Sequence, residues 1–182
     1  MQADVATLEA GLDAVREAPR DVGRLELIVR RPAVDEREVL DQAQLDTNVG
    51  LAGDTWQLRG SSSTPDGSPH PDDQLTLMNA RAAALMAGPI DRWPLAGDQL
   101  YVDFDLGVDN LPAGTRLAIG DAVIEVTEKP HTGCAKFAKR FGKEAVKFVN
   151  SPDGRALRLR GVNAKVVSGG AIRAGDSVCK TD

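Results

Sequence analysis

The stretch EKPHTGCAKFAKRFGKEA, residues 128–145, places a cysteine where its sulfur could do chemistry. Thr132 is a candidate N-cap for the helix that follows, and it would put Cys134 in the first helical turn. Unpaired backbone N–H groups and the helix dipole favour an anion there. A thiolate is the form of cysteine that attacks electrophiles and binds metals, so this setting predicts a reactive sulfur. Further positive charge nearby comes from three side chains, Lys129, His131 and Lys136.

The same cysteine also fits a structural interpretation. Cys134, Phe137, Ala138 and Phe141 follow the spacing i, i+3, i+4, i+7, which would turn the sulfur and both rings toward one core. Free cysteine is among the most buried residue types, so the local pattern by itself favours this interpretation. Sequence spacing does not decide between a reactive and a buried cysteine.

Charge is divided unevenly along the chain. Residues 1–128 contain 10 Arg and 23 acidic residues, a balance of -13, whereas residues 129–182 contain 12 basic and 4 acidic residues, a balance of +8. A basic part that begins just before Cys134 favours an anionic ligand and an ionised thiol, although a solvated helix face is the alternative. The total charge of -5 and an aromatic content of 4% argue against a nucleic acid partner.

The sequence also predicts a compartment. Two cysteines, Cys134 and Cys179, are too few for a disulfide scaffold. The first twenty residues carry acidic side chains where a signal peptide needs basic ones, and no segment approaches the roughly 18 apolar residues of a membrane span. We therefore expect a cytoplasmic protein without a membrane partner, in which both thiols stay reduced.

Short strands with a few helices between them make up the expected fold. A polar loop is predicted over residues 60–73 and hairpin-type turns over residues 98–130. These elements indicate a single domain over residues 1–182, with a β-rich mixed α/β fold and a closed or nearly closed barrel. The remaining predictions are an N-terminal helix over 4–17, a strand over 24–32, a strand feeding a helix over 74–88, and strands near 157–159, 166–167 and 172–178.

A longer set of motifs has a known counterpart. The segments RLELIVRRP, GLAGDTW, QLTLMN, LAIGDAVIEVTEKPHTGCAKF and LRGVNAKVVSGGAIRAGDSV occur in the order seen in the MOSC family, named for the C-terminal domain of molybdenum cofactor sulfurase. The chain resembles that family from about Leu25 to Val178. The resemblance implies a MOSC-type β-barrel over residues 25–178, preceded by the N-terminal helix within residues 1–20, and a functional cysteine at Cys134.

The resemblance also implies further site residues. Asp54 matches a GD-x-H pattern of the family, but Trp56 stands where histidine is often found, which puts a histidine role there in doubt. Simpler structural interpretations remain open for three of these residues: a turn cap for Asp54, an exposed strand position for Arg160, and a turn for Asn163. The full set of candidate cofactor-binding residues is Asp54, His131, Thr132, Lys136, Arg160 and Asn163.

The resemblance implies molybdenum cofactor (molybdopterin) chemistry. Family members transfer sulfur to this cofactor, or hold it through the cysteine and reduce N-hydroxylated compounds, so Cys134 would be a persulfide carrier or a molybdenum ligand. The sequence contains no pyridoxal-phosphate-dependent desulfurase domain, which implies a separate cysteine desulfurase or a separate electron-transfer protein as partner. The other hypotheses are a barrel that binds an anionic metabolite or partner protein without catalysis, and a thiol redox protein.

Overall fold

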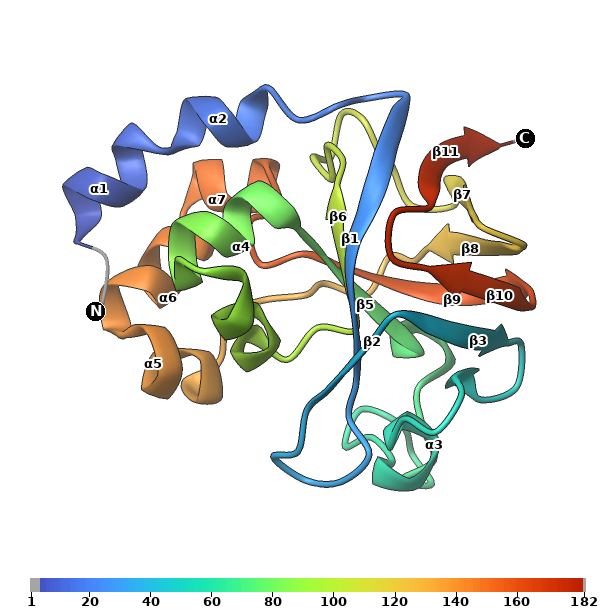
Figure 1. The fold of residues 1–182 in the computed structure, drawn as a ribbon. Helices are drawn as coiled ribbons and strands as arrows, with labels where there is room; N and C mark the ends of the chain where they lie inside the picture. Colours follow the sequence, from blue (N-terminus) through green and yellow to red (C-terminus); the bar gives the residue numbers. More distant parts are fainter. Residues whose placement is uncertain (1–3, 182) are drawn as a thin grey trace.

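Seven strands close a mixed β-barrel in the computed structural model, which describes residues 4–181 (Figure 1). The strands follow the order β11, β7, β8, β9, β5, β6, β1, and β1 pairs with β11 to close the ring. The β5–β6 pair is parallel, and the other neighbours are antiparallel. The barrel strands are β1 (Val22–Arg30), β5 (Leu75–Asn79), β6 (Leu100–Asp103), β7 (Arg116–Ile119), β8 (Ala122–Val126), β9 (Val162–Ser168) and β11 (Ser177–Thr181).

Four further strands lie outside the ring. Strand β2 (Glu38–Leu40) extends the barrel sheet by pairing with β1. A small antiparallel sheet has the order β10–β3–β4, with β10 at Gly170–Arg173, β3 at Gln42–Asp46 and β4 at Gly50–Leu51. Closing the barrel removes the exposed edges that an open sheet of this size would present. The predicted β-rich mixed fold with a barrel and inserted short helices is confirmed.

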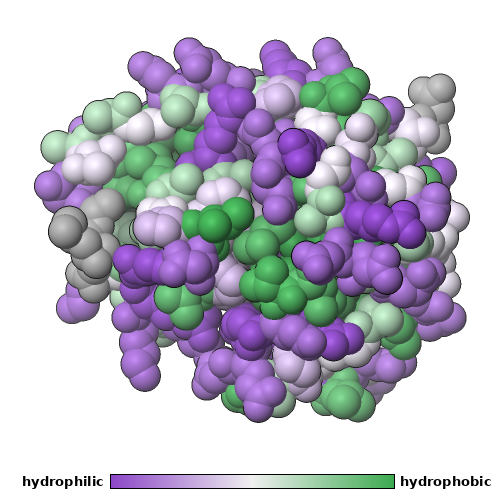
Figure 2. Space-filling model, viewed as in Figure 1, coloured by the Kyte–Doolittle hydropathy of each residue, from purple (hydrophilic) through white to green (hydrophobic). Residues whose placement is uncertain are grey.

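Two hydrophobic cores explain the packing. One collects buried side chains from every barrel strand, and the other lies between the barrel wall and the helices. On β1, Leu25 and Ile28 belong to the barrel core, whereas Leu27 and Val29 belong to the helix-side core. Successive side chains from Leu27 to Val29 point to opposite faces, and a register shift between Leu25 and Leu27 turns Leu25 to the barrel face, so one strand serves both cores. Figure 2 shows polar side chains over most of this face of the molecule, with hydrophobic ones gathered near its centre.

The helices lie mostly on one side of the barrel (Figure 1). None of the helices within residues 4–181 is long and apolar enough to cross a lipid bilayer. The α-helices are α1 (Val5–Ala10), α2 (Leu12–Arg16), α3 (Trp56–Arg59), α4 (Ala80–Ala87), α5 (Ala135–Phe141), α6 (Lys143–Val149) and α7 (Pro152–Ala156), and the 3₁₀ helices are η1 (Pro71–Asp73) and η2 (Ile90–Ala96).

Most predicted elements are present, with three corrections. The single strand predicted over 172–178 is instead the end of β10 and the start of β11, separated by a turn in which Gly175 has φ 97°. The strand over 24–32 and the strand feeding a helix over 74–88 are confirmed by β1 and by β5 with α4. The single N-terminal helix is instead two helices that meet at Gly11. The strand predicted near Leu157 and Leu159 is wrong: these residues form a turn after α7. Arg158 between them has φ 48°, which no strand accommodates, and Leu159 packs in the helix-side core.

Candidate functional site

Cys134 lies at the N-terminal end of α5, just outside the helix. Its backbone is extended, with φ -121° and ψ 178°, and its carbonyl accepts the first helical hydrogen bond, from the Ala138 N–H at 2.9 Å. Cys134 is therefore itself the cap residue, and the prediction of Thr132 as N-cap is wrong. The segment before Cys134 is held outside the helix by Asn150, the residue that follows α6. The Asn150 side-chain amide accepts a hydrogen bond from the Gly133 N–H (3.0 Å) and donates one to the Gly133 carbonyl (3.1 Å).

The core interpretation of Cys134 is also wrong. Phe137 and Phe141 are buried against each other, with ring centroids 4.8 Å apart, whereas Cys134 is exposed. The i, i+3, i+7 pattern applies to residues inside a helix, and Cys134 precedes it, so its side chain does not follow the buried face. No hydrogen bond within residues 4–181 engages its sulfur, which leaves the sulfur available to a ligand.

The exposed Cys134 lines a cavity of about 650 Å³. Six of the seven candidate residues line this cavity: His131, Thr132, Cys134, Lys136, Arg160 and Asn163. Seven cationic side chains line it, namely Arg31, Arg37, Arg59, Lys129, Lys136, Arg140 and Arg160, against the two carboxylates of Asp35 and Asp73. Counted with Asp54 and Asp98, the buried carboxylates that pair with Arg31 and Arg160, and with His131 neutral, the site carries a net charge of +3, which favours an anionic ligand.

Three of these cations have no carboxylate partner within the described part of the chain: Arg37, Arg59 and Lys136. The pKa values of Arg37 and Arg59 are lowered, first by burial and then by the positive charges of neighbouring arginines, including Arg31. The Nε atom of Arg37 is buried and has no hydrogen-bond partner. Like charges crowded around an open space repel one another, so an anion placed among them would relieve that repulsion.

Asp54 does not line the cavity but holds one of its arginines. Its carboxylate accepts two hydrogen bonds of 2.8 Å from the Arg31 guanidinium and one of 3.0 Å from the Arg31 backbone N–H. It also accepts the Trp56 backbone N–H at 3.0 Å, so the simpler interpretation as a turn cap is true as well. Both side chains are almost fully buried. Asp54 is therefore placed to act through Arg31.

A buried carboxylate that sequence reasoning missed joins two of the candidate residues. Asp98 is completely buried and contacts His131 Nε2 at 2.8 Å and the Arg160 guanidinium at 2.5 Å. Burial would raise the pKa of Asp98, but the charge of Arg160, with His131 and the hydrogen bonds from both, lowers it to about 2. Asp98 follows Gly97 in a Gly-Asp pair, which in sequence marks only a turn, and nothing in the local pattern indicates that its side chain is buried as Asp54 is in the pair Gly53–Asp54.

His131 and Arg160 form the inner wall beside this carboxylate. Burial, and then the charge of Arg160, lowers the pKa of His131 despite the opposing effect of Asp98. Arg160 also donates to the Ala96 carbonyl at 2.9 Å and lies over the Phe137 ring, 5.0 Å from its centroid. Its Nε atom is buried without a hydrogen-bond partner. Arg160 is thus 6% exposed, and the alternative of an exposed strand arginine is wrong.

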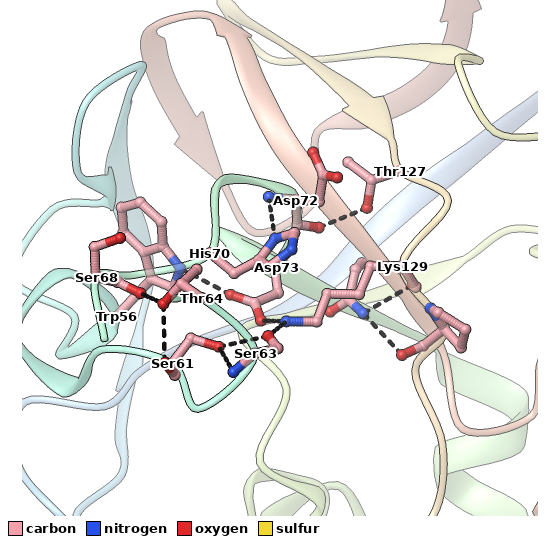
Figure 3. Close-up of polar contacts among 12 residues, drawn as sticks. Trp56, Ser61, Ser63, Thr64, Ser68, His70, Asp72, Asp73, Thr127 and Lys129 are labelled. Carbon is pink, nitrogen blue, oxygen red and sulfur yellow. Dashed lines mark hydrogen bonds and ion pairs between the residues drawn. The ribbon is translucent and has the colours of Figure 1, made fainter. Parts of the chain in front are cut away.

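Lys129 ties the polar loop to the cavity wall (Figure 3). Its ammonium group pairs with Asp73 and donates to Ser63 Oγ at 3.1 Å, and Asp73 in turn accepts the Trp56 indole N–H at 3.0 Å. Asn163 fixes the backbone of the same segment by donating to the Lys129 carbonyl at 3.0 Å. Asn163 lies in β9 and is buried, so the alternative of a turn position is wrong.

A second cavity of about 480 Å³ adjoins the first. The two share six lining residues, among them His131, Thr132 and Arg160, but Cys134 lines only the larger one. Within residues 4–181 no group of three or more His, Cys, Asp or Glu side chains is arranged to hold a metal ion. A metal at Cys134 would therefore need most of its ligands from a bound molecule.

The structure is a closed mixed β-barrel with an exposed cysteine beside a basic cavity. The family model described as "MOSC domain" matches residues 71–179, which is more than half of the chain. This chain belongs to the MOSC domain family, which is typically associated with the molybdenum cofactor. No curated protein matches the sequence.

Solved structures share the fold. The chain is similar to YuaD from Bacillus subtilis, with a TM-score of 0.60 and 17% identity over 86% of this chain and 94% of that one. YiiM from Escherichia coli matches with a TM-score of 0.57 and 19% identity, over 87% of this chain and 70% of that one. YiiM from Geobacillus stearothermophilus matches with a TM-score of 0.54 and 12% identity, over 91% of this chain and 75% of that one. At these identities the likeness concerns the fold alone.

Proposed function

We propose that this protein binds molybdenum cofactor in the larger cavity and uses the Cys134 sulfur in the chemistry of that cofactor. The observation that carries the proposal is the exposure of Cys134 on the wall of a cavity whose site carries a net charge of +3. A soft thiolate is a suitable ligand for a transition metal, and a phosphate group of the cofactor is matched by lysine and arginine side chains.

The residues present fit the cofactor in their donor chemistry. Cys134 is the one soft donor on the cavity wall, and the other metal ligands would come from the dithiolene sulfurs that the cofactor brings. When bound, the cofactor would supply a redox-active molybdenum centre. Arg37, Arg59 and Lys136 are the cations free to receive its anionic group, while Asp98 keeps Arg160 and His131 in place on the inner wall.

Two forms of this chemistry suit the site. As a sulfur carrier, Cys134 would hold a persulfide received from a separate cysteine desulfurase. As a molybdenum ligand, Cys134 would position the cofactor for reduction of N-hydroxylated compounds, with electrons from a separate electron-transfer protein. Both forms need an accessible thiolate and a positive cavity, and the exposure of Cys134 together with the unpaired cations supports each.

Molybdenum and pterin content per protein tests the proposal. Wild type, Cys134→Ala and Cys179→Ala are purified from a host that makes the cofactor. Cys179 is a matched control because it lies half-buried in β11 and does not line the cavity. We expect wild type and Cys179→Ala to carry molybdenum and Cys134→Ala to lose it. Loss in neither variant would show that Cys134 is not a ligand. If all three proteins lack both molybdenum and pterin, stable binding of the cofactor is excluded.

A second candidate function is binding of an anion without catalysis. It is favoured by the cations of the cavity, which are present whether or not the cysteine reacts. Isothermal titration with inorganic phosphate distinguishes the two. If wild type never retains molybdenum and Cys134→Ala binds phosphate as tightly as wild type, the protein is an anion-binding module and does not hold the cofactor.

A further inference from the structure

Two large hydrophobic side chains at the cavity are unusually exposed. Leu58 on α3 is 86% exposed, and Val34 in the loop between β1 and β2 is 81% exposed. They are the two most exposed large hydrophobic side chains within residues 4–181, and both line the same cavity as Cys134. Val34 and Leu58 lie in separate segments of the chain, and the fold brings both to the same cavity.

Single exposed aliphatic residues are normal on protein surfaces and need no explanation. Two such side chains that line one cavity are different, because one ligand that fills the cavity can contact both. The volume of about 650 Å³ lies within the range of about 300–1,000 Å³ typical of small-molecule sites, which combine hydrophobic walls with a few charged groups. Here the charged groups are the arginines and lysines that line the same cavity.

We propose that Val34 and Leu58 form a hydrophobic mouth that selects an organic molecule with a hydrophobic ring or chain and a polar end. The hydrophobic part would lie between these two side chains, while the polar end reaches toward Cys134 and the cations. The inference rests on the proposed function, since the mouth belongs to the same cavity, and it assigns that function a substrate class. A protein partner is a poorer fit, because a specific interface needs about 800 Å² per partner and two aliphatic side chains supply a small part of that.

Fluorescence titration with 1-anilinonaphthalene-8-sulfonate tests the mouth, because this probe joins hydrophobic rings to an anionic group. The variants are Leu58→Ser, Val34→Ser and the double variant. Val22→Ser is the matched control, since Val22 is 62% exposed on β1 but does not line the cavity. Each cavity variant removes hydrophobic surface that the bound probe would cover, so each should weaken binding by about tenfold.

The expected result is one bound probe per chain, weaker binding in the cavity variants, an unchanged dissociation constant in Val22→Ser, and the same melting temperature in all. An absent probe complex, a double variant that binds as tightly as wild type, or equal weakening by Val22→Ser would each overturn the proposal. Molybdenum content separates this inference from the proposed function. Leu58→Ser should retain the molybdenum level of wild type. If wild type carries no molybdenum, the proposed cofactor binding is refuted, and the probe titration alone tests the hydrophobic mouth.

Discussion

Replacing Asp98 with asparagine removes the one carboxylate that holds both Arg160 and His131. A pKa lowered from 3.8 to about 2 corresponds to about 2.5 kcal/mol of stabilisation, since one pKa unit is worth about 1.36 kcal/mol. The substitution also leaves Arg160, with a side chain 7% exposed, as a buried charge without its partner, and such losses typically cost about 3–5 kcal/mol. We therefore expect Asp98→Asn to lower the free energy of unfolding by about 3 kcal/mol.

Urea denaturation at neutral pH measures this loss. Asp13→Asn is the control, because Asp13 pairs with Arg16 on the surface and its side chain is 86% exposed, so the change should cost less than about 1 kcal/mol. A carboxylate with a lowered pKa contributes stability above its unfolded pKa, and this contribution is lost as the pH falls through the folded pKa. The difference between wild type and Asp98→Asn should therefore shrink between about pH 4 and pH 2. A loss under about 1 kcal/mol at neutral pH, or a difference that stays constant on acidification, would refute the reasoning.

Three further predictions follow from the same region. Gly161 has φ 107°, and an added Cβ would collide with the Leu77 carbonyl, so Gly161→Ala should lower the free energy of unfolding by more than about 2 kcal/mol, measured by thermal denaturation. The control is Gly114→Ala, where φ is 89° but the space is open, and it should lower the free energy of unfolding by about 1 kcal/mol. The pKa of His131 is lowered from 6.5, so wild type should lose stability as the pH falls below about 6.5, and His131→Asn should flatten that part of the urea midpoint curve; an unchanged slope contradicts the assignment. Arg59→Met removes a cation crowded by its neighbours, so it should weaken inorganic phosphate binding several-fold in calorimetry without lowering the melting temperature, and unaltered affinity would remove Arg59 from the anion site.

The sequence predicted the barrel because its strands carry alternating apolar residues between Gly-Asp turns. On β8 every second residue is buried, which is the pattern that the alternation indicates. The turn after α7 was not predictable in this way, since Leu157 and Leu159 also alternate. Their place depends on the positive φ of Arg158 and on packing against distant helices.

The sequence motif and the chemistry of the thiol together singled out Cys134 as a candidate. Residues that only long-range contacts bring to the site were not predictable. The basic cavity was expected from the lysines of residues 129–182, but three of its seven cations, Arg31, Arg37 and Arg59, come from the acidic part of the chain. Asp98 is 33 residues from His131 and 62 from Arg160, and no local spacing connects them. The position of Cys134 outside α5 likewise depends on Asn150, which lies in another turn of the chain.

The closure of the barrel through β1 and β11 sets when the cavity can exist during synthesis. The first ring strand to be translated, β1, has to wait for β11, which follows all the other ring strands in the sequence. Until that pairing forms, the segments that carry Arg31 and Arg160 are not held in one ring, and their side chains cannot face a common ligand. Non-local pairing of this kind slows folding, because the long loop must close first. A chain in which β1 and β11 have not yet paired therefore lacks the complete cavity, and a ligand that needs both segments is taken up after the ring closes.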